Sequence, residues 1–281
     1  MGVRIRVSRA VPLRSPGVAT RRAAYPLQID VQAGHQHDGG HGPILAAHNR
    51  GVGPVSTYWT AVGIGAVLAA VACVVAARRP GAVARRVGRV LALVLAADAV
   101  AFVLRPVIAG GWSVRGSLPL ALCDVALGIA ALACWFPGWR LGVELTYFWG
   151  LAGSLQAVVT PDLGQRFPDP EFFVFVVAHV GIVTAALYLV AALRIAPRPG
   201  SVGRVFAITV GYTAGVGVVD WLAGANYMYL ARRPAHASLL SVLGPWPWYL
   251  GGAAAVALAL FWLLDLPFRW RTRQSRVPRP A

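Results

Sequence analysis

Seven long apolar runs constrain the fold of this sequence more than any other feature. About 20 apolar residues cross the hydrocarbon core of a bilayer, and lipid offers no partner to an unpaired backbone amide, so each run should form a helix. The chain is 57% hydrophobic with a mean hydropathy of +0.62, which is too apolar for an ordinary soluble domain. We therefore predict an all-α, polytopic membrane bundle of about seven transmembrane helices. The runs cover approximately residues 57–77, 89–109, 117–136, 141–160, 172–193, 204–224 and 247–266.

Polar segments flank the predicted transmembrane domain, residues 55–268. We expect residues 1–54, rich in Arg, His and Gly, to form a disordered tail or to result from a gene start placed too far upstream. Residues 269–281 should form a basic cytoplasmic tail. In the first tail His35, His37 and His41 have a spacing that could capture zinc or copper, but a Gly-rich segment provides no folded ligand frame. We expect no bound metal and no cofactor.

The positive charge of the chain, +16 in total, flanks the apolar runs. Such cations act as membrane anchors and orientation signals, so we do not expect a nucleic-acid partner. Arginine clusters follow the first predicted span, the fifth span and the last span, and the positive-inside rule places these segments in the cytoplasm. Seven spans then put the N-terminus outside the cell membrane and the C-terminus inside. The clusters are Arg78, Arg79, Arg85, Arg86 and Arg89; Arg194, Arg198 and Arg204; and Arg269, Arg271, Arg273, Arg276 and Arg279.

A thiol and an imidazole within the apolar runs are the strongest indication of chemistry. With a helical rise of roughly 1.5 Å per residue, Cys123 lies roughly 9 Å below Ser117, and His179 lies roughly 10 Å below Phe172. Both helices enter from the outer face in the predicted topology, so the two groups share a leaflet and a depth. A nearby imidazole is the usual activator of a cysteine nucleophile. Cys123 and His179 are therefore a candidate catalytic dyad.

Other polar residues of the spans collect at the same end of the predicted bundle and suggest a polar pocket in the outer leaflet. Charges inside spans usually face a partner, so Asp124 and Arg105, at comparable depth, are expected to form an ion pair. Backbone amides within helices are already engaged, which leaves Gln156, Asn226 or Tyr227 as donors to an oxyanion. The residues that collect here are Arg105, Gln156, Thr160, Asp220 and Asn226.

Six strings between about residues 105 and 266 resemble the YwaF-type bacterial integral membrane proteins. They are Leu118-Pro-Leu-Ala-Leu-Cys-Asp124, Glu144-Leu-Thr-Tyr-Phe-Trp-Gly-Leu-Ala-Gly-Ser-Leu-Gln156, Thr160-Pro-Asp-Leu163, Phe172-Phe173 with His179, Asn226-Tyr-Met-Tyr-Leu230 and Gly244-Pro-Trp-Pro-Trp-Tyr249. The eukaryotic relatives of that family, the transmembrane protein 164 family, are acyltransferases of ether-phospholipid remodelling. The resemblance implies an acyl carrier at Cys123 with His179 as its base, acting on membrane lipids.

Three classes of function remain open. The first is a phospholipid acyltransferase or thiol acyl hydrolase, with Cys123 as nucleophile, His179 as base and acid, and Asp124 or Gln156 in support. A transporter or channel would instead use a second set of residues lining a continuous path. A non-catalytic membrane scaffold is favoured if the thiol and imidazole lie far apart. The set for the transporter is Asp98, Arg105, Asp124 and Asp220.

Overall fold

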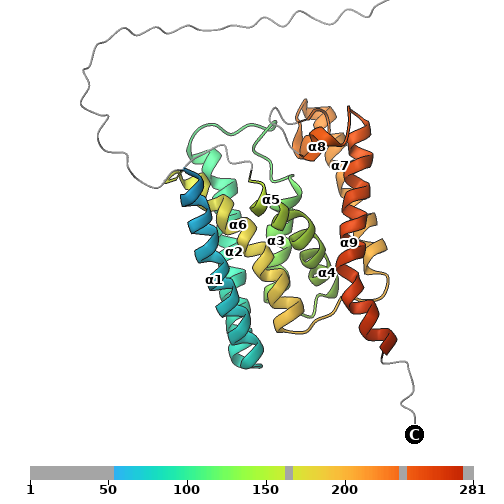
Figure 1. Ribbon diagram of the computed structural model, residues 1–281. Coiled ribbons are helices and arrows are strands. Elements are labelled where there is room, and N and C mark those ends of the chain that lie inside the picture. Colours follow the sequence, from blue (N-terminus) through green and yellow to red (C-terminus); the bar gives the residue numbers. More distant parts are fainter. Residues whose placement is uncertain (1–53, 162–166, 234–238, 275–281) are drawn as a thin grey trace, which may run out of the picture. The chain divides into compact units, whose positions relative to one another are not determined.

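The computed structural model describes residues 54–161, 167–233 and 239–274, and within these ranges all regular secondary structure is helical (Figure 1). The all-α prediction is confirmed. The α-helices are α1 (Pro54–Arg78), α2 (Ala82–Ile108), α3 (Leu122–Trp135), α4 (Arg140–Trp149), α5 (Leu155–Val159), α6 (Pro170–Leu187), α7 (Ser201–Ala223), α8 (Leu239–Val242) and α9 (Trp248–Gln274). Two π-helical turns, η1 (Gly150–Ser154) and η2 (Tyr188–Ala192), and a 3-10 turn, η3 (Tyr227–Tyr229), complete the set.

Five of the predicted spans correspond to helical segments in the described ranges that are long and apolar enough to cross a bilayer. The third predicted span is shorter, because α3 has only 14 residues and begins at Leu122. The fourth is one helical rod of three parts, α4, η1 and α5, in which the π-helical turn interrupts the α-helical register. The five long segments are Ser56–Arg78, Ala82–Ile108, Pro170–Ala192, Ser201–Ala223 and Trp248–Trp270.

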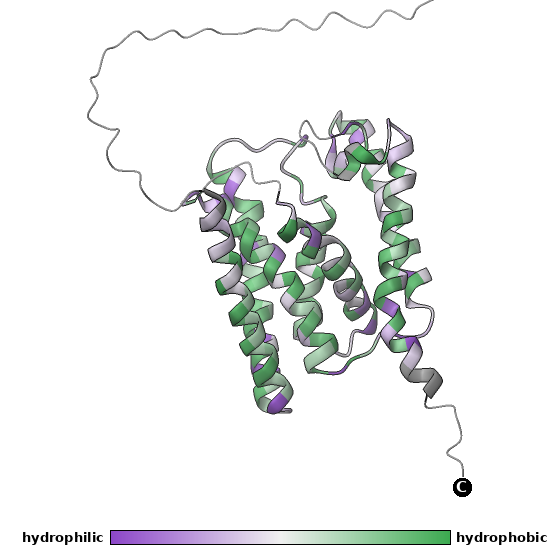
Figure 2. Ribbon diagram, in the orientation of Figure 1, coloured by the Kyte–Doolittle hydropathy of each residue, from purple (hydrophilic) through white to green (hydrophobic). Residues whose placement is uncertain are grey.

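The long helices expose apolar side chains on a scale that water does not favour. Only 6% of the apolar window of α1 is buried inside the protein, and Leu68, Trp221 and Leu222 are 65%, 80% and 71% exposed. Figure 2 shows hydrophobic residues along most of the length of these helices. Exposed apolar patches of this extent require a non-aqueous environment, and lipid supplies it. The protein is an integral membrane protein with several spans.

The core forms where α3 packs against α2, α4 and α6. The face of α3 toward these helices carries alanines, and Ala126, Ala130 and Ala133 are at most 1% exposed. Small side chains let helix backbones approach closely, which is the usual basis of helix association in membranes. Larger side chains fill the space between the other helices, among them Leu95 and Ile182, both 0% exposed.

A buried carboxylate ties α4 to the segment that enters α7. Glu144 is 1% exposed and accepts hydrogen bonds from the side chains of Arg198, at 2.8 and 3.1 Å, and Arg204, at 3.0 and 3.2 Å. The backbone N–H of Arg198 adds a further bond of 3.0 Å. Hydrogen bonding to Glu144 raises the pKa of the Arg198 guanidinium further above its usual value. The two arginine partners compensate for the free-energy cost of burying the charged carboxylate.

Several predictions concern residues that the structure does not describe. The N-terminal tail with its histidines lies outside the described residues, apart from Pro54, and so do the last seven residues of the chain. The tail and metal predictions for these segments therefore stay predictions.

We expect Glu144→Gln to lower the thermal unfolding temperature of the detergent-solubilised protein by about 5 °C, because two arginines lose a shared buried counter-charge. Glu171→Gln is the matched control: this carboxylate pairs with Arg105 but is 45% exposed, so its loss should lower the temperature by less than about 2 °C. Tryptophan fluorescence on heating measures both. Equal shifts in the two variants would contradict the role given to Glu144.

Candidate active site at the start of α3

Cys123 is the second residue of α3 and not the seventh of a longer helix, as the sequence had suggested. The helix begins at Leu122, and Ala121 is its N-cap with extended dihedral angles, φ −64° and ψ 148°. Proline disfavours the helical conformation in the residue before it, so Pro119 keeps Leu118 out of a helix. The estimate of depth that assumed helical rise from Ser117 is therefore wrong. Cys123 instead occupies the first turn of a helix.

The first turn of α3 leaves main-chain donors free. The N–H groups of Asp124 and Val125 donate to the carbonyl of Ala121 at 3.0 and 3.4 Å. Within the described ranges, no acceptor is found for the N–H groups of Leu122 and Cys123. Free N–H groups and the positive end of the helix dipole together favour a negative charge at this point. The expectation that backbone amides around Cys123 are engaged is wrong for this turn.

Ser154 lies beside the Cys123 thiol, where η1 packs against α3, and its hydroxyl is within hydrogen-bonding reach of the sulfur. It ends the π-helical turn η1, is 1% exposed, and apart from the Cys123 thiol its hydroxyl has no hydrogen-bond partner among the described residues. Ser154 was not predicted from the sequence, because one serine in an apolar helix is unremarkable. The feature that marks Ser154 is the π-helical turn, which frequently occurs at functional sites but is visible only in the backbone geometry.

His179 lies midway along α6, where its ring contacts that of Phe175 with centroids 4.1 Å apart. Its Nδ1 is 2.8 Å from the carbonyl oxygen of Phe175. A carbonyl only accepts, so Nδ1 carries the proton and Nε2 is left as an acceptor. Among the described contacts, no hydrogen bond joins this ring to the thiol of Cys123, although α6 packs against both α3 and η1. The dyad stays a prediction.

The expected ion pair between Asp124 and Arg105 is wrong. One oxygen of Asp124 accepts the N–H of Ala121 at 3.0 Å, so the carboxylate caps its own helix. The guanidinium of Arg105 instead pairs with Glu171, in the first turn of α6. Asp124 thus has a structural role in fixing where α3 begins.

Tyr227 holds the segment that leads into α3. Its hydroxyl accepts the N–H of Leu118 at 2.9 Å and donates to the carbonyl of Val114 at 2.8 Å. The N–H of Tyr227 donates to Asp220 at 2.8 Å. The hydroxyl of Tyr212 donates to the carbonyl of Leu120 at 2.9 Å. These bonds connect α7 and η3 to the non-helical chain before Cys123. Tyr227, Asp220 and Tyr212 therefore position the start of α3.

Among the described contacts, none joins the remaining predicted site residues to Cys123. Asn226 accepts the N–H groups of Ala231 and Arg232 at 3.0 and 2.9 Å, so it shapes its own loop. Gln156 is exposed. Asp98 is 8% exposed on α2, and one of its oxygens has no hydrogen-bond partner among the described residues. Asn226, Tyr227 and Gln156 are thus poor candidates for oxyanion donors.

The four residues of the transporter hypothesis are likewise not brought together. Asp124 bonds to its own helix cap, Arg105 to Glu171, and Asp220 to Tyr227. Within the described ranges no ion pair or hydrogen bond joins any two of Asp98, Arg105, Asp124 and Asp220. Nothing in these contacts favours a continuous path.

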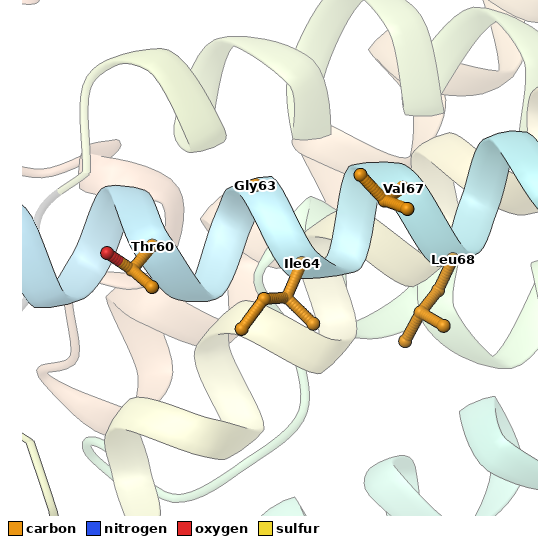
Figure 3. A pocket seen from close by; sticks show the side chains of 5 residues that line it. All are labelled: Thr60, Gly63, Ile64, Val67 and Leu68. Carbon is orange, nitrogen blue, oxygen red and sulfur yellow. The ribbon is translucent and has the colours of Figure 1, made fainter.

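Two surface depressions lie away from Cys123. One of about 430 Å³ runs along α1, and Figure 3 shows the side chains that line it, from Thr60 to Leu68, on that one helix. The lining includes no nucleophilic cysteine and no titratable group. The other, of about 440 Å³, lies between η2 and α9 and includes Arg194 and Phe268. No group of three or more His, Cys, Asp or Glu suited to a metal occurs within the described ranges.

We expect Tyr227→Phe to speed hydrogen exchange of the backbone between Val114 and Leu120 by about tenfold, because two hydrogen bonds to this segment are lost. Tyr58→Phe is the matched control, since it removes a hydroxyl that donates to Val158, at another site. Mass spectrometry of the exchanged protein measures both. Unchanged protection in Tyr227→Phe would contradict its positioning role.

Comparison with known proteins places this chain in a family. The family model described as the TMEM164 family matches residues 51–265, which include all of α1 to α8, most of α9, Cys123, Ser154 and His179. No curated protein and no solved structure matches the chain. The resemblance to the transmembrane protein 164 family is confirmed, whereas the YwaF name is not confirmed. The chain belongs to the TMEM164 family.

Proposed function

We propose that this protein is a phospholipid acyltransferase or thiol acyl hydrolase that carries a fatty acyl chain on Cys123. The observation that carries the proposal is the place of Cys123 in the first turn of α3, with free N–H groups and the buried hydroxyl of Ser154 beside its thiol. A cysteine at a helix N-terminus is in an environment typical of reactive thiols. The surrounding helices expose apolar surface, so lipid esters are the substrates nearest at hand.

The reaction proceeds in two steps. Nε2 of His179 takes the thiol proton, the sulfur attacks the ester carbonyl of a phospholipid, and a C–S bond forms. The tetrahedral intermediate collapses as the C–O bond breaks, and the leaving alkoxide takes the proton from the imidazolium. Water or the hydroxyl of a lysophospholipid then attacks the thioester, with His179 moving the proton again. The thiol returns, and the products are a fatty acid or a new phospholipid.

The site faces the non-cytoplasmic leaflet in this proposal. Contacts between Arg105 and Glu171 and between Leu118 and Tyr227 bring the end of α2 and the starts of α6 and α3 to the same end of the bundle as η3. The arginine-rich ends of α1, η2 and α9 lie at the other end of the bundle, away from η3 and the start of α3. The positive-inside rule assigns those ends to the cytoplasm. An outside N-terminus and an inside C-terminus follow.

The test is to trap the acyl-enzyme in nanodiscs that contain a phospholipid with a labelled acyl chain. We expect a hydroxylamine-sensitive acyl group on Cys123, detected by mass spectrometry, and its complete loss in Cys123→Ala. Cys73→Ala is the matched control, because that half-buried thiol lies in α1, away from the start of α3. Transfer of the label by Cys123→Ala at the wild-type rate would exclude the proposed nucleophile.

We expect His179→Gln to slow acyl transfer by about 10²–10⁴-fold, the usual contribution of a general base. The loss should be smaller at high pH, because hydroxide then removes the thiol proton in place of the imidazole. Rates measured between neutral and alkaline pH on the labelled phospholipid test this. A uniform loss across the pH range would assign His179 to packing alone.

A further inference from the structure

The hydroxyl of Ser154 is in an unusual state for a helical serine. Buried hydroxyls of helices commonly donate to the carbonyl four residues earlier, as Thr184 does to Val180 at 2.7 Å. For Ser154 that carbonyl belongs to Gly150, which already accepts the N–H of Leu155 in the π-helical register. Ser154 is 1% exposed, and apart from the Cys123 thiol its hydroxyl has no partner among the described residues, so its O–H can turn from the sulfur to an incoming oxygen.

The position of this donor matters because η1 packs against α3 and the hydroxyl lies against the Cys123 thiol. The N–H groups of Leu122 and Cys123 are the other unpaired donors of the first turn of α3 among the described residues. A side-chain O–H thus lies at the sulfur of a residue whose own N–H is unpaired, together with that of Leu122. Preorganised donors around a nucleophile are the arrangement that stabilises the negative oxygen formed when a carbonyl is attacked.

We propose that Ser154 and the N–H groups of Leu122 and Cys123 form an oxyanion-binding site that acts on the carbonyl oxygen of an acyl ester. The inference rests on the acyl-transfer function proposed above. When the sulfur of Cys123 bonds to the carbonyl carbon, the π electrons of the C=O bond move to its oxygen, and the three donors bind that oxygen. When the C–O bond to the leaving alcohol breaks, the carbonyl reforms and the thioester remains on Cys123.

Two reactions of the same thiol separate this role from a general effect on Cys123. Acylation by p-nitrophenyl butyrate passes through a tetrahedral oxyanion, whereas alkylation by iodoacetamide displaces iodide directly and forms no oxyanion. We expect Ser154→Ala to slow single-turnover acylation of Cys123 by about 10²–10³-fold, the usual effect of losing one oxyanion donor. Its alkylation rate should stay within about threefold of the wild type. Mass spectrometry of the Cys123 peptide from the full-length protein follows both reactions.

Ser201→Ala is the matched control. Ser201 is also a fully buried hydroxyl without a partner among the described residues, but it begins α7, next to the arginines that bind Glu144. We expect it to leave both rates unchanged. The alkylation rate also reports whether the Cys123 site is folded in each variant, so a slow acylation cannot be mistaken for unfolding.

Three results would overturn the inference. One is equal slowing of acylation and alkylation in Ser154→Ala, which would assign Ser154 to the thiol itself or to the local fold. Another is unchanged acylation in that variant. The third is a wild-type Cys123 that reacts with iodoacetamide but not with the ester. If the ester reaction depends on Ser154 while the wild type transfers no acyl chain between phospholipids, the oxyanion site stands and the proposed lipid substrate fails.

Discussion

Lipid offers no hydrogen-bond partners, and this constraint explains why the irregular parts of the bundle are built as they are. The chain between α2 and α3 is not helical, so its amides and carbonyls need partners from elsewhere in the protein. Tyr227 and Tyr212 supply them through their hydroxyls. Because this segment has external partners, α3 can begin late, and Cys123 comes to lie in its first turn. The position of Cys123 in the fold thus depends on side chains from α7 and η3.

The two ends of the bundle fix their non-helical segments with different side chains. At one end the buried Glu144 binds Arg198 and Arg204 and fixes the connection between η2 and α7. At the other end neutral hydroxyls and the carboxylates of Asp124 and Asp220 bind backbone groups. The Glu144 cluster keeps its arginines partly hydrated. The other end also holds an ion pair, between Arg105 and Glu171, but the start of α3 itself is held by hydroxyls and by the Asp124 and Asp220 carboxylates. The separation is consistent with a site at the end that lacks the arginine clusters.

The sequence predicted the helices well, because apolar runs of spanning length have few alternatives in a membrane. It also selected Cys123 and His179 by their chemistry. The start of α3 was placed too early, since hydropathy does not register the effect of Pro119 on Leu118. The partner of Arg105 could not be predicted either, because depth along a helix axis does not tell which neighbour a long side chain reaches. Ser154 was overlooked because the π-helical register that frees its hydroxyl is a feature of backbone geometry.

Packing between η1 and α6 links the proposed oxyanion site to the proposed base. At Gly150 a side chain would meet Ile182 and Ala186 of α6 at 3.2 and 3.3 Å, so the absence of a Cβ permits the close approach of the two rods. Ser154 lies one turn further along the same rod, and His179 lies one turn before Ile182 on α6. This contact therefore helps to fix the hydroxyl and the imidazole relative to each other. A base that waits without a hydrogen bond to its nucleophile is common in enzymes free of substrate, where the final contact forms on binding. In the proposed mechanism, the contact between Cys123 and His179 would likewise form only when a lipid ester binds.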